Sequence, residues 1–151
     1  IGDSAIRSLM ARLYDPDAQL RMNVAETLGM IKSPRAVHPL VTLLRDEHPY
    51  VRCNAAWSLG EIGDSEAAQP LIELFKDEVP LVRTFAIDAL QKIKSPDAIE
   101  PLINALRDED QEVRSMSAVA LFVITGLNYG EDYEQWSQWW QEYQYYYRYS
   151  R

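Results

Sequence analysis

The sequence predicts an all-α solenoid of four two-helix repeats, closed by a capping helix at its carboxyl end. When the chain is aligned with itself at a shift of 31 residues, matching side chains superpose from residue 3 to residue 126 without a gap. Each unit contains two stretches in which apolar residues recur at helical spacing, and no stretch alternates as a strand would. A tryptophan-rich segment follows the last unit. Such a period is typical of stacked helix pairs, which bury their apolar sides against one another.

The most regular columns of the alignment hold one residue type in every unit. They are an aspartate column (Asp15, Asp46, Asp77, Asp108), an arginine column (Arg21, Arg52, Arg83, Arg114) and a leucine column (Leu28, Leu59, Leu90, Leu121). We therefore divide the chain into repeats at 3–33, 34–64, 65–95 and 96–126, followed by a Trp/Tyr-rich capping helix and tail at 127–151.

The second repeat illustrates the two helices, which we call helix A and helix B. Their apolar positions are Val37, Leu40, Val41 and Leu44 for helix A, and Val51, Ala55, Leu59 and Ile62 for helix B. Ser33-Pro34 is typical of a helix cap followed by proline at the first helical position. Pro39 kinks helix A if the helix starts at that cap and costs little if it starts later, and both alternatives stay open.

Glycines punctuate the second helix of the repeats. Gly63 follows helix B, where a left-handed residue is favoured. Gly29 and Gly60 lie inside helix B, where each costs about 1 kcal/mol relative to alanine. We expect these two glycines to allow the close approach of a neighbouring helix.

Composition excludes several classes of function. The formal charge of −8 repels phosphate backbones, so nucleic acid is not an expected partner. No apolar run is long enough to span a bilayer and no signal peptide is recognisable, so we expect a soluble, cytoplasmic chain without membrane contact. One cysteine and two histidines predict neither a disulfide nor a metal site. No motif indicates a cofactor or a catalytic residue.

The repeat pattern resembles a known family. The sequence Ala36-x-x-Pro39-Leu40, Leu44-x-Asp46 and Val51-Arg52-x-x-Ala55-Ala56-x-x-Leu59-Gly60-x-Ile62-Gly63-Asp64 is similar to HEAT repeats, and more narrowly to the short HEAT-like repeats first named from phycobilisome bilin lyase subunits. The resemblance implies an armadillo-like helical array. It also implies that the aspartate and arginine columns form a ladder in which an aspartate at the end of helix A meets an arginine at the start of helix B, often in the adjacent unit. The alternative is that these arginines bind a phosphate or carboxylate ligand.

The exposed stripe of helix B is the candidate binding surface. In HEAT solenoids the B helices typically line the concave side, so the stripe opposite the core faces a partner protein. Its large and charged residues, on which we place partner binding, are Asn54, Trp57, Glu61, Phe85, Asp88 and Lys92. An alternative role for Trp57 is to fill a gap between repeats. Excess acidic charge favours a partner with a basic or polar patch.

The end of the chain predicts a cap. Helix B of the fourth repeat is apolar on nearly every side, so we expect the tail to bury it. Asp132 can cap a final helix whose predicted docking face carries Trp136, Trp139, Trp140 and Tyr143. The alternative is an aromatic hook that binds a partner. Residues 144–149 show no helical stripe, and we expect a loose tail rather than a tyrosine-rich contact strip.

The start of the chain repeats the end of a B helix. Ile1-Gly2-Asp3-Ser4 matches Ile62-Gly63-Asp64-Ser65, and the chain begins without methionine. We therefore expect either a processed form or a chain that continues into further N-terminal repeats.

These observations predict a non-catalytic scaffold or adaptor that binds another protein on the concave face formed by the B helices. The resemblance implies an alternative, a bilin lyase subunit or phycobilisome-associated factor in which Trp57 and Phe85 line a pigment groove. A third possibility is a spacer domain of a larger repeat protein.

Overall fold

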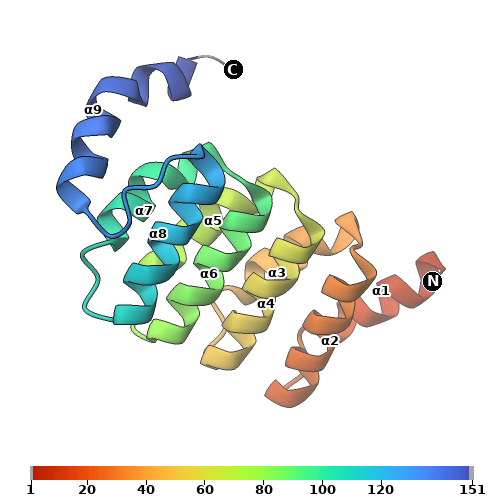
Figure 1. Cartoon of the computed structure of the whole chain (residues 1–151). Helices are drawn as coiled ribbons and strands as arrows, with labels where there is room; N and C mark the ends of the chain where they lie inside the picture. Colours follow the sequence, from red (N-terminus) through yellow and green to blue (C-terminus); the bar gives the residue numbers. More distant parts are fainter. Residues whose placement is uncertain (1, 150–151) are drawn as a thin grey trace.

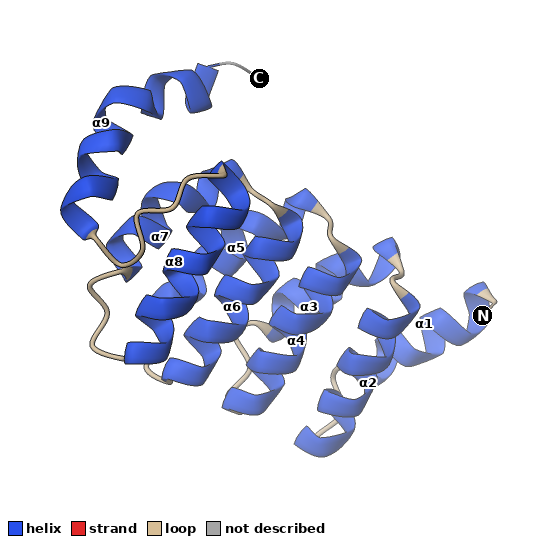
Figure 2. Cartoon of the chain, in the orientation of Figure 1, coloured by secondary structure: helices blue, strands red, loops and turns tan. Residues whose placement is uncertain are grey.

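The computed structural model describes residues 2–149, and all regular structure in that range is helical (Figure 2). Ile1, which takes part in the predicted repeat at the start of the chain, lies outside the described residues. The α-helices are α1 (Asp3–Arg12), α2 (Ala18–Ile31), α3 (Val37–Leu43), α4 (Pro49–Ile62), α5 (Ala68–Glu73), α6 (Pro80–Ile93), α7 (Ile99–Ala105), α8 (Gln111–Thr125) and α9 (Tyr133–Tyr149). The short 3-10 helices are η1 (Pro34–Ala36), η2 (Ser65–Ala67), η3 (Leu74–Lys76) and η4 (Pro96–Ala98).

The helices form two layers (Figure 1). Helices α2, α4, α6 and α8 are the B helices and lie side by side, while α1, α3, α5 and α7 are the A helices behind them. The B helices pack directly on one another, whereas α3 and α5 reach the next unit through η2 and η4. The B helices are therefore the more closely packed of the two layers. The predicted all-α solenoid is confirmed.

The core lies between the two layers and repeats along the array. All four members of the leucine column have no exposed surface. So do Leu40, Leu71 and Leu102, which face them from the A helices. Burial of a leucine side chain contributes about 1.5–3 kcal/mol, so these two rows supply much of the stability of the stack.

The structure decides between the two alternatives for Pro39. Ser33 is the N-cap residue of η1 and Pro34 its first residue, so the predicted cap stands at this 3-10 helix, although the Ser33 side chain makes no capping hydrogen bond. Helix α3 begins only at Val37. Pro39 is therefore in the first turn, where its missing N–H has no helical acceptor to lose, and it does not kink the helix.

The close approach at the two helical glycines is confirmed. A Cβ atom built on Gly29 of α2 would lie 2.8 Å from the Cα of Ser58 in α4. One built on Gly60 of α4 would lie 2.7 Å from the Cα of Ala89 in α6. The first three B helices therefore touch backbone to backbone, which any larger side chain at these positions would prevent.

The last helix, α9, packs differently from the predicted cap. Three tryptophans of α9, Trp136, Trp139 and Trp140, are buried, but Tyr143 is 47% exposed. Helix α9 packs mainly against α7 in the A layer. The prediction that it buries α8 is wrong, because Phe122 and Val119 of α8 stay about half exposed at 49% and 53%. The apolar sequence of α8 predicts that burial of the helix is favourable, but it does not identify the helix that would cover it.

The predicted loose tail is also wrong in its backbone, because α9 continues as a helix to Tyr149. The Asp132 carboxylate accepts a hydrogen bond from the N–H of Gln135 at 3.0 Å, which is the geometry of a helix cap. No α-helix within residues 2–149 is long and apolar enough to cross a bilayer.

Candidate functional site

The arginine and aspartate columns meet between successive repeats. Arg21 donates from Nε and Nη2 to the Asp46 carboxylate at 2.8 and 2.9 Å, and from Nη1 to the carbonyl oxygen of Asp15 at 2.8 Å. Arg52 binds Asp77 in the same way, and Arg83 donates to Asp108 at 2.8 Å. Each arginine thus joins its own A–B turn to the aspartate of the next unit.

These arginines are committed to the fold. The side chains of Arg21, Arg52 and Arg83 are no more than 11% exposed, and each donates to the carboxylate of the next repeat and to a carbonyl oxygen of its own A–B turn. Burial, the largest influence, raises the pKa of Asp46, but the hydrogen bonds from Arg21 and from the N–H of His48 lower it overall. An external anion would have to displace a buried carboxylate, which argues against the ligand-binding alternative.

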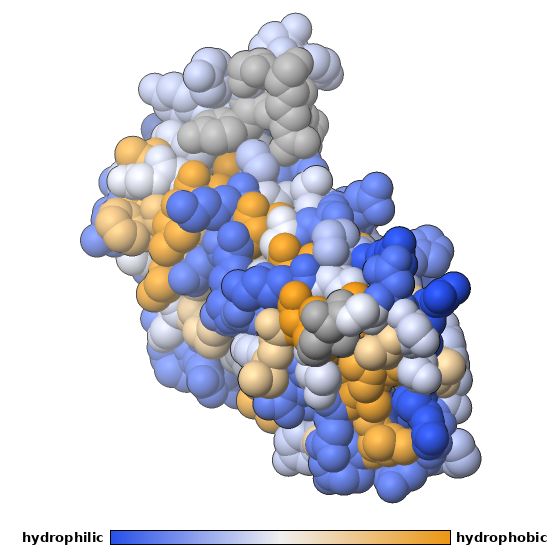
Figure 3. Space-filling model, turned by 90° about the vertical axis from the view of Figure 1, so that its right-hand side faces the viewer, coloured by the Kyte–Doolittle hydropathy of each residue, from blue (hydrophilic) through white to orange (hydrophobic). Residues whose placement is uncertain are grey.

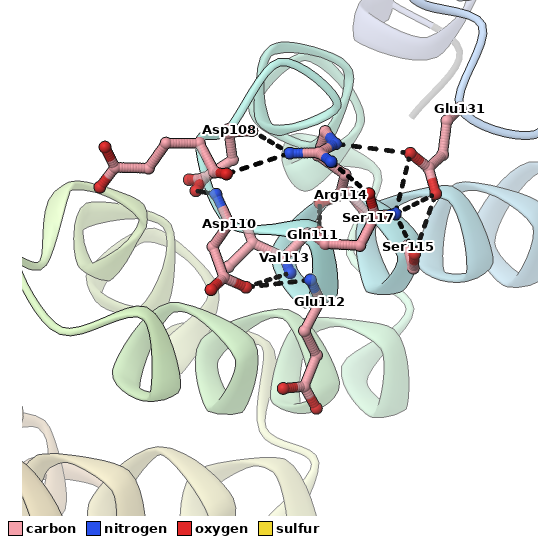
Figure 4. A network of polar contacts seen from close by, with 10 residues as sticks. Asp108, Asp110, Gln111, Glu112, Val113, Arg114, Ser115, Ser117 and Glu131 are labelled. Carbon is pink, nitrogen blue, oxygen red and sulfur yellow. Dashed lines mark hydrogen bonds and ion pairs between the residues drawn. The ribbon is translucent and has the colours of Figure 1, made fainter.

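The series of arginine–aspartate pairs ends at Arg114, which pairs with a glutamate outside the aspartate column (Figure 4). Trp139 stands 31 residues after Asp108, so the column supplies no fifth aspartate. Instead Glu131, in the loop before α9, lies 3.6 Å from Arg114 Nε. It also accepts hydrogen bonds from Ser115 at 2.9 Å and from Gln111 at 3.1 Å. Glu131 therefore anchors the start of the capping segment to α8.

The predicted binding residues lie on the exposed stripe of the B layer, which we call the B face. Along the array the B face consists of Asn23, Glu26, Met30, Asn54, Trp57, Glu61, Phe85, Asp88, Lys92, Met116, Val119 and Val123. Its middle carries charged and aromatic side chains, and its end on α8 is apolar. In the view from the side of α1 and α2, hydrophilic side chains separate narrower apolar strips on the surface (Figure 3).

The centre of the B face is an ion-pair cluster built by three helices. Lys92 of α6 lies 2.8 Å from both Glu61 of α4 and Asp88 of its own helix. Lys32, at the end of α2, approaches the other Glu61 oxygen at 3.4 Å. The Lys92 ammonium also sits 5.9 Å from the ring centroid of Trp57. Glu61 and Lys92 share one repeat column, Trp57 and Asp88 share another, and their side chains converge because adjacent B helices touch.

Electrostatics within this cluster favour the charged forms. The hydrogen bond from Lys92, followed by the contact with Lys32, lowers the pKa of Glu61 against a smaller opposing effect of burial. Burial lowers the pKa of Lys92, but Asp88 and Glu61 together raise it overall. Both shifts favour the charged forms of Glu61 and Lys92.

The remaining predicted residues have mixed roles. Trp57 and Phe85 are both half-buried, so each fills space between helices and still presents part of its ring. The Asn54 amide donates to the carbonyl oxygen of Met22 in α2 at 3.3 Å, which engages it in holding two repeats together. Its neighbour Ser58, which the sequence analysis did not single out, donates to the Ala25 carbonyl at 2.8 Å and is fully buried.

Two polar residues of this arrangement were missed from sequence. Lys32 follows the end of α2, outside the B-helix stripe. Its contact with Glu61 could not be predicted, because its repeat column does not hold lysine in every unit. Glu131 lies after the last repeat, where the columns stop. The lone cysteine is not a reactive site, because burial raises the pKa of Cys53 to about 11.

Comparisons with known proteins support the fold. A family model described as HEAT repeats matches residues 6–86 and 72–126. No curated protein matches the chain.

Several solved structures share the architecture. The complex of CpcE and CpcF of phycocyanin lyase from Nostoc sp. PCC7120 matches with 25% identity and a TM-score of 0.75, over 93% of this chain and 58% of that one. Human deoxyhypusine hydroxylase matches with 23% identity and a TM-score of 0.70, over 93% of this chain and 46% of that one. A designed armadillo repeat protein in complex with the peptide (KR)4 matches with 24% identity and a TM-score of 0.64, over 87% and 68%.

This chain spans less than two thirds of the first solved chains it matches, at 62%, 58% and 46% of their lengths. The family model, in contrast, covers most of the sequence, from residue 6 to residue 126. The chain belongs to the HEAT repeat family.

Proposed function

We propose that the chain is a non-catalytic scaffold that binds an extended, basic segment of a partner protein along the B face. The observation that carries this proposal is the cluster of Glu61, Asp88 and Lys92 beside the partly exposed Trp57. It combines carboxylates with an aromatic ring at the centre of the B layer, and repeat solenoids use such surfaces to bind extended chains.

An incoming cation has a carboxylate to bind. The Lys32 side chain is 61% exposed, so its contact with Glu61 contributes little and a partner lysine or arginine can replace it. The net charge of −8 steers a basic segment toward the molecule. The similar designed armadillo protein in complex with (KR)4 gives a precedent for this chemistry on this architecture.

The test uses a fluorescent (KR)4 peptide and fluorescence anisotropy at low salt. The double variant E61Q/D88N keeps the side-chain shapes and removes both carboxylates, and we expect it to weaken binding by about three- to tenfold. The matched control E66Q/E73Q removes two carboxylates from α5 and η2 on the opposite layer and leaves affinity unchanged. Equal affinity of all three proteins for the peptide would remove the B face from consideration.

A second candidate function rests on the similarity to the complex of CpcE and CpcF of phycocyanin lyase. In that case the half-buried rings of Trp57 and Phe85 contact a bilin. Titration of a free bilin distinguishes the two candidates, because pigment binding shifts its absorption band and W57A abolishes the shift. A band that does not move on addition of the protein excludes this candidate.

A further inference from the structure

The outer side of α8 is an exposed apolar surface at the end of the B layer. Phe122, Val119 and Val123 are 49%, 53% and 36% exposed. They occupy adjacent positions on one helix, at spacings of three and four residues, so they form one continuous patch. This patch lies outside the ion-pair cluster of the B face.

The repeat register shows that the position of Phe122 corresponds to positions that contact the next B helix in earlier repeats. Phe122 stands 31 residues after Gln91, in the same column as Gly29 and Gly60. The two glycines are the positions at which α2 and α4 meet the next B helix. Phe122 therefore points to the place where a fifth B helix would continue the stack.

Within residues 2–149, the chain fills only the A side of that place. Helix α9 packs against α7, and its buried tryptophans lie on that side. Figure 1 shows α9 leading away from the array, with α8 the last helix of its layer. A cavity of about 580 Å³ opens beside α9. It is lined by Thr125 at the end of α8, by Leu127 in the following loop, and by Trp139, Glu142, Tyr143 and Tyr146 of α9.

The charge that lines this cavity is acidic. Among the described residues, Glu142 is the only charged side chain that lines the cavity. A ligand that combines apolar and basic groups is complementary to this surface.

We propose that the space between α8 and α9 is a docking site for a basic amphipathic helix of another protein. The helix takes the position of a fifth B helix. Its apolar stripe lies on Phe122 and Val119 and against the ring of Tyr143, and its lysine or arginine side chains reach Glu142. This is recognition of a helix in a groove, with the partner completing the repeat stack.

A second copy of this chain is a poor occupant. In head-to-tail stacking, the register places Thr27 of a second α2 against Phe122. Thr27 and its neighbour Asn23 are exposed and polar, and Thr27 Oγ1 donates to the Asn23 carbonyl at 2.7 Å. Each copy also carries a charge of −8, so two copies repel one another.

The test probe is a fluorescent amphipathic helical peptide of about 18 residues, built from leucine, alanine and lysine. A second peptide with glutamate in place of lysine tests the charge preference. We expect the lysine peptide to bind in anisotropy titrations, and V119S/F122S to weaken it about tenfold or more. Y143A removes the opposite wall and should also weaken binding, whereas Y145A alters a 72% exposed ring outside the cavity lining and should not.

The E66Q/E73Q variant is the charge control, because it removes two carboxylates of the A layer and should leave binding of the helical peptide unchanged. Near-ultraviolet circular dichroism of the tryptophans checks that each variant is folded. The proposal is overturned if the lysine peptide fails to bind, if the glutamate peptide binds equally well, or if V119S/F122S binds like the parent protein. A concentration-dependent dimer that V119S/F122S abolishes would overturn it in favour of a second copy.

Discussion

At the residue scale, the ends of the B helices show how backbone conformation and sequence interact. The residues after α2, α4, α6 and α8 all adopt a left-handed conformation, but two are glycines and two are lysines. Gly63 and Gly126 have φ of 75° and 78°, while Lys32 and Lys94 have φ of 54° and 55°. A side chain at such a position is strained by its Cβ atom, which glycine lacks.

Replacing Lys94 with glycine should therefore stabilise the protein by about 0.5–1 kcal/mol, measured by urea unfolding. The converse change, Gly63→Ala, should destabilise it by a similar amount. The control K76G alters a lysine without positive φ and should lower stability slightly. If K94G and K76G shift the midpoint in the same direction, the strain argument is wrong.

A second prediction at this scale contrasts a buried and an exposed ion pair. Asp77→Asn leaves the buried guanidinium of Arg52 without its anion, and we expect a loss of about 2–4 kcal/mol in the free energy of unfolding. Glu73→Gln makes the same chemical change in the pair with Arg45, where the side chains are 60% and 84% exposed. That variant should lose less than about 0.5 kcal/mol. Similar losses from both would show that the ladder contributes no more than a surface pair.

At the scale of the elements, the contact between neighbouring B helices sets their spacing. Gly60 allows α4 to touch the backbone of α6 at Ala89, and the same column holds Gln91 in the third repeat. Sequence spacing predicted the close approach, because a glycine inside a helix is costly unless something needs its missing Cβ atom. It could not predict that Phe122, in the same column, would have no helix to meet.

Gly60→Ala should cost about 1–3 kcal/mol in thermal or urea unfolding, even though alanine is the better helix former. The matched variant Gln91→Ala changes the same column and adds no atom, so we expect it to be close to neutral. Stabilisation by G60A would mean that the two helices separate without cost.

At the scale of the whole molecule, one repeated ladder holds the units in register, so the loss of one of its pairs weakens the contact between two units. Although burial acts in the opposite direction, the bonds from Arg21 and the His48 N–H hold the pKa of Asp46 below its ordinary value. A carboxylate with a lowered folded pKa stabilises the protein above its usual pKa of about 4, and that contribution is lost as the pH falls toward the folded pKa.

We therefore expect the free energy of unfolding to fall between about pH 5 and pH 2, followed by urea titrations across that range. Asp46→Asn removes one titrating group, so the variant should be less stable at pH 6 and less sensitive to acid. Parallel pH profiles for parent and variant would contradict the role assigned to this pair.

The sequence alone determined the repeat, the two helical layers and the columns from which the ladder is built. It could do so because each unit meets a copy of itself, and the same contacts must recur at the same spacing. Only the tertiary structure decided where the unrepeated parts lie. Amphipathicity tells which side of α9 is buried but not against which neighbour, so the docking on α7, the exposure of Phe122 and the anchoring by Glu131 depend on how the last repeat ends. The contact of Lys32 with Glu61 likewise depends on how closely two helices pack, and periodicity carries no information about that distance.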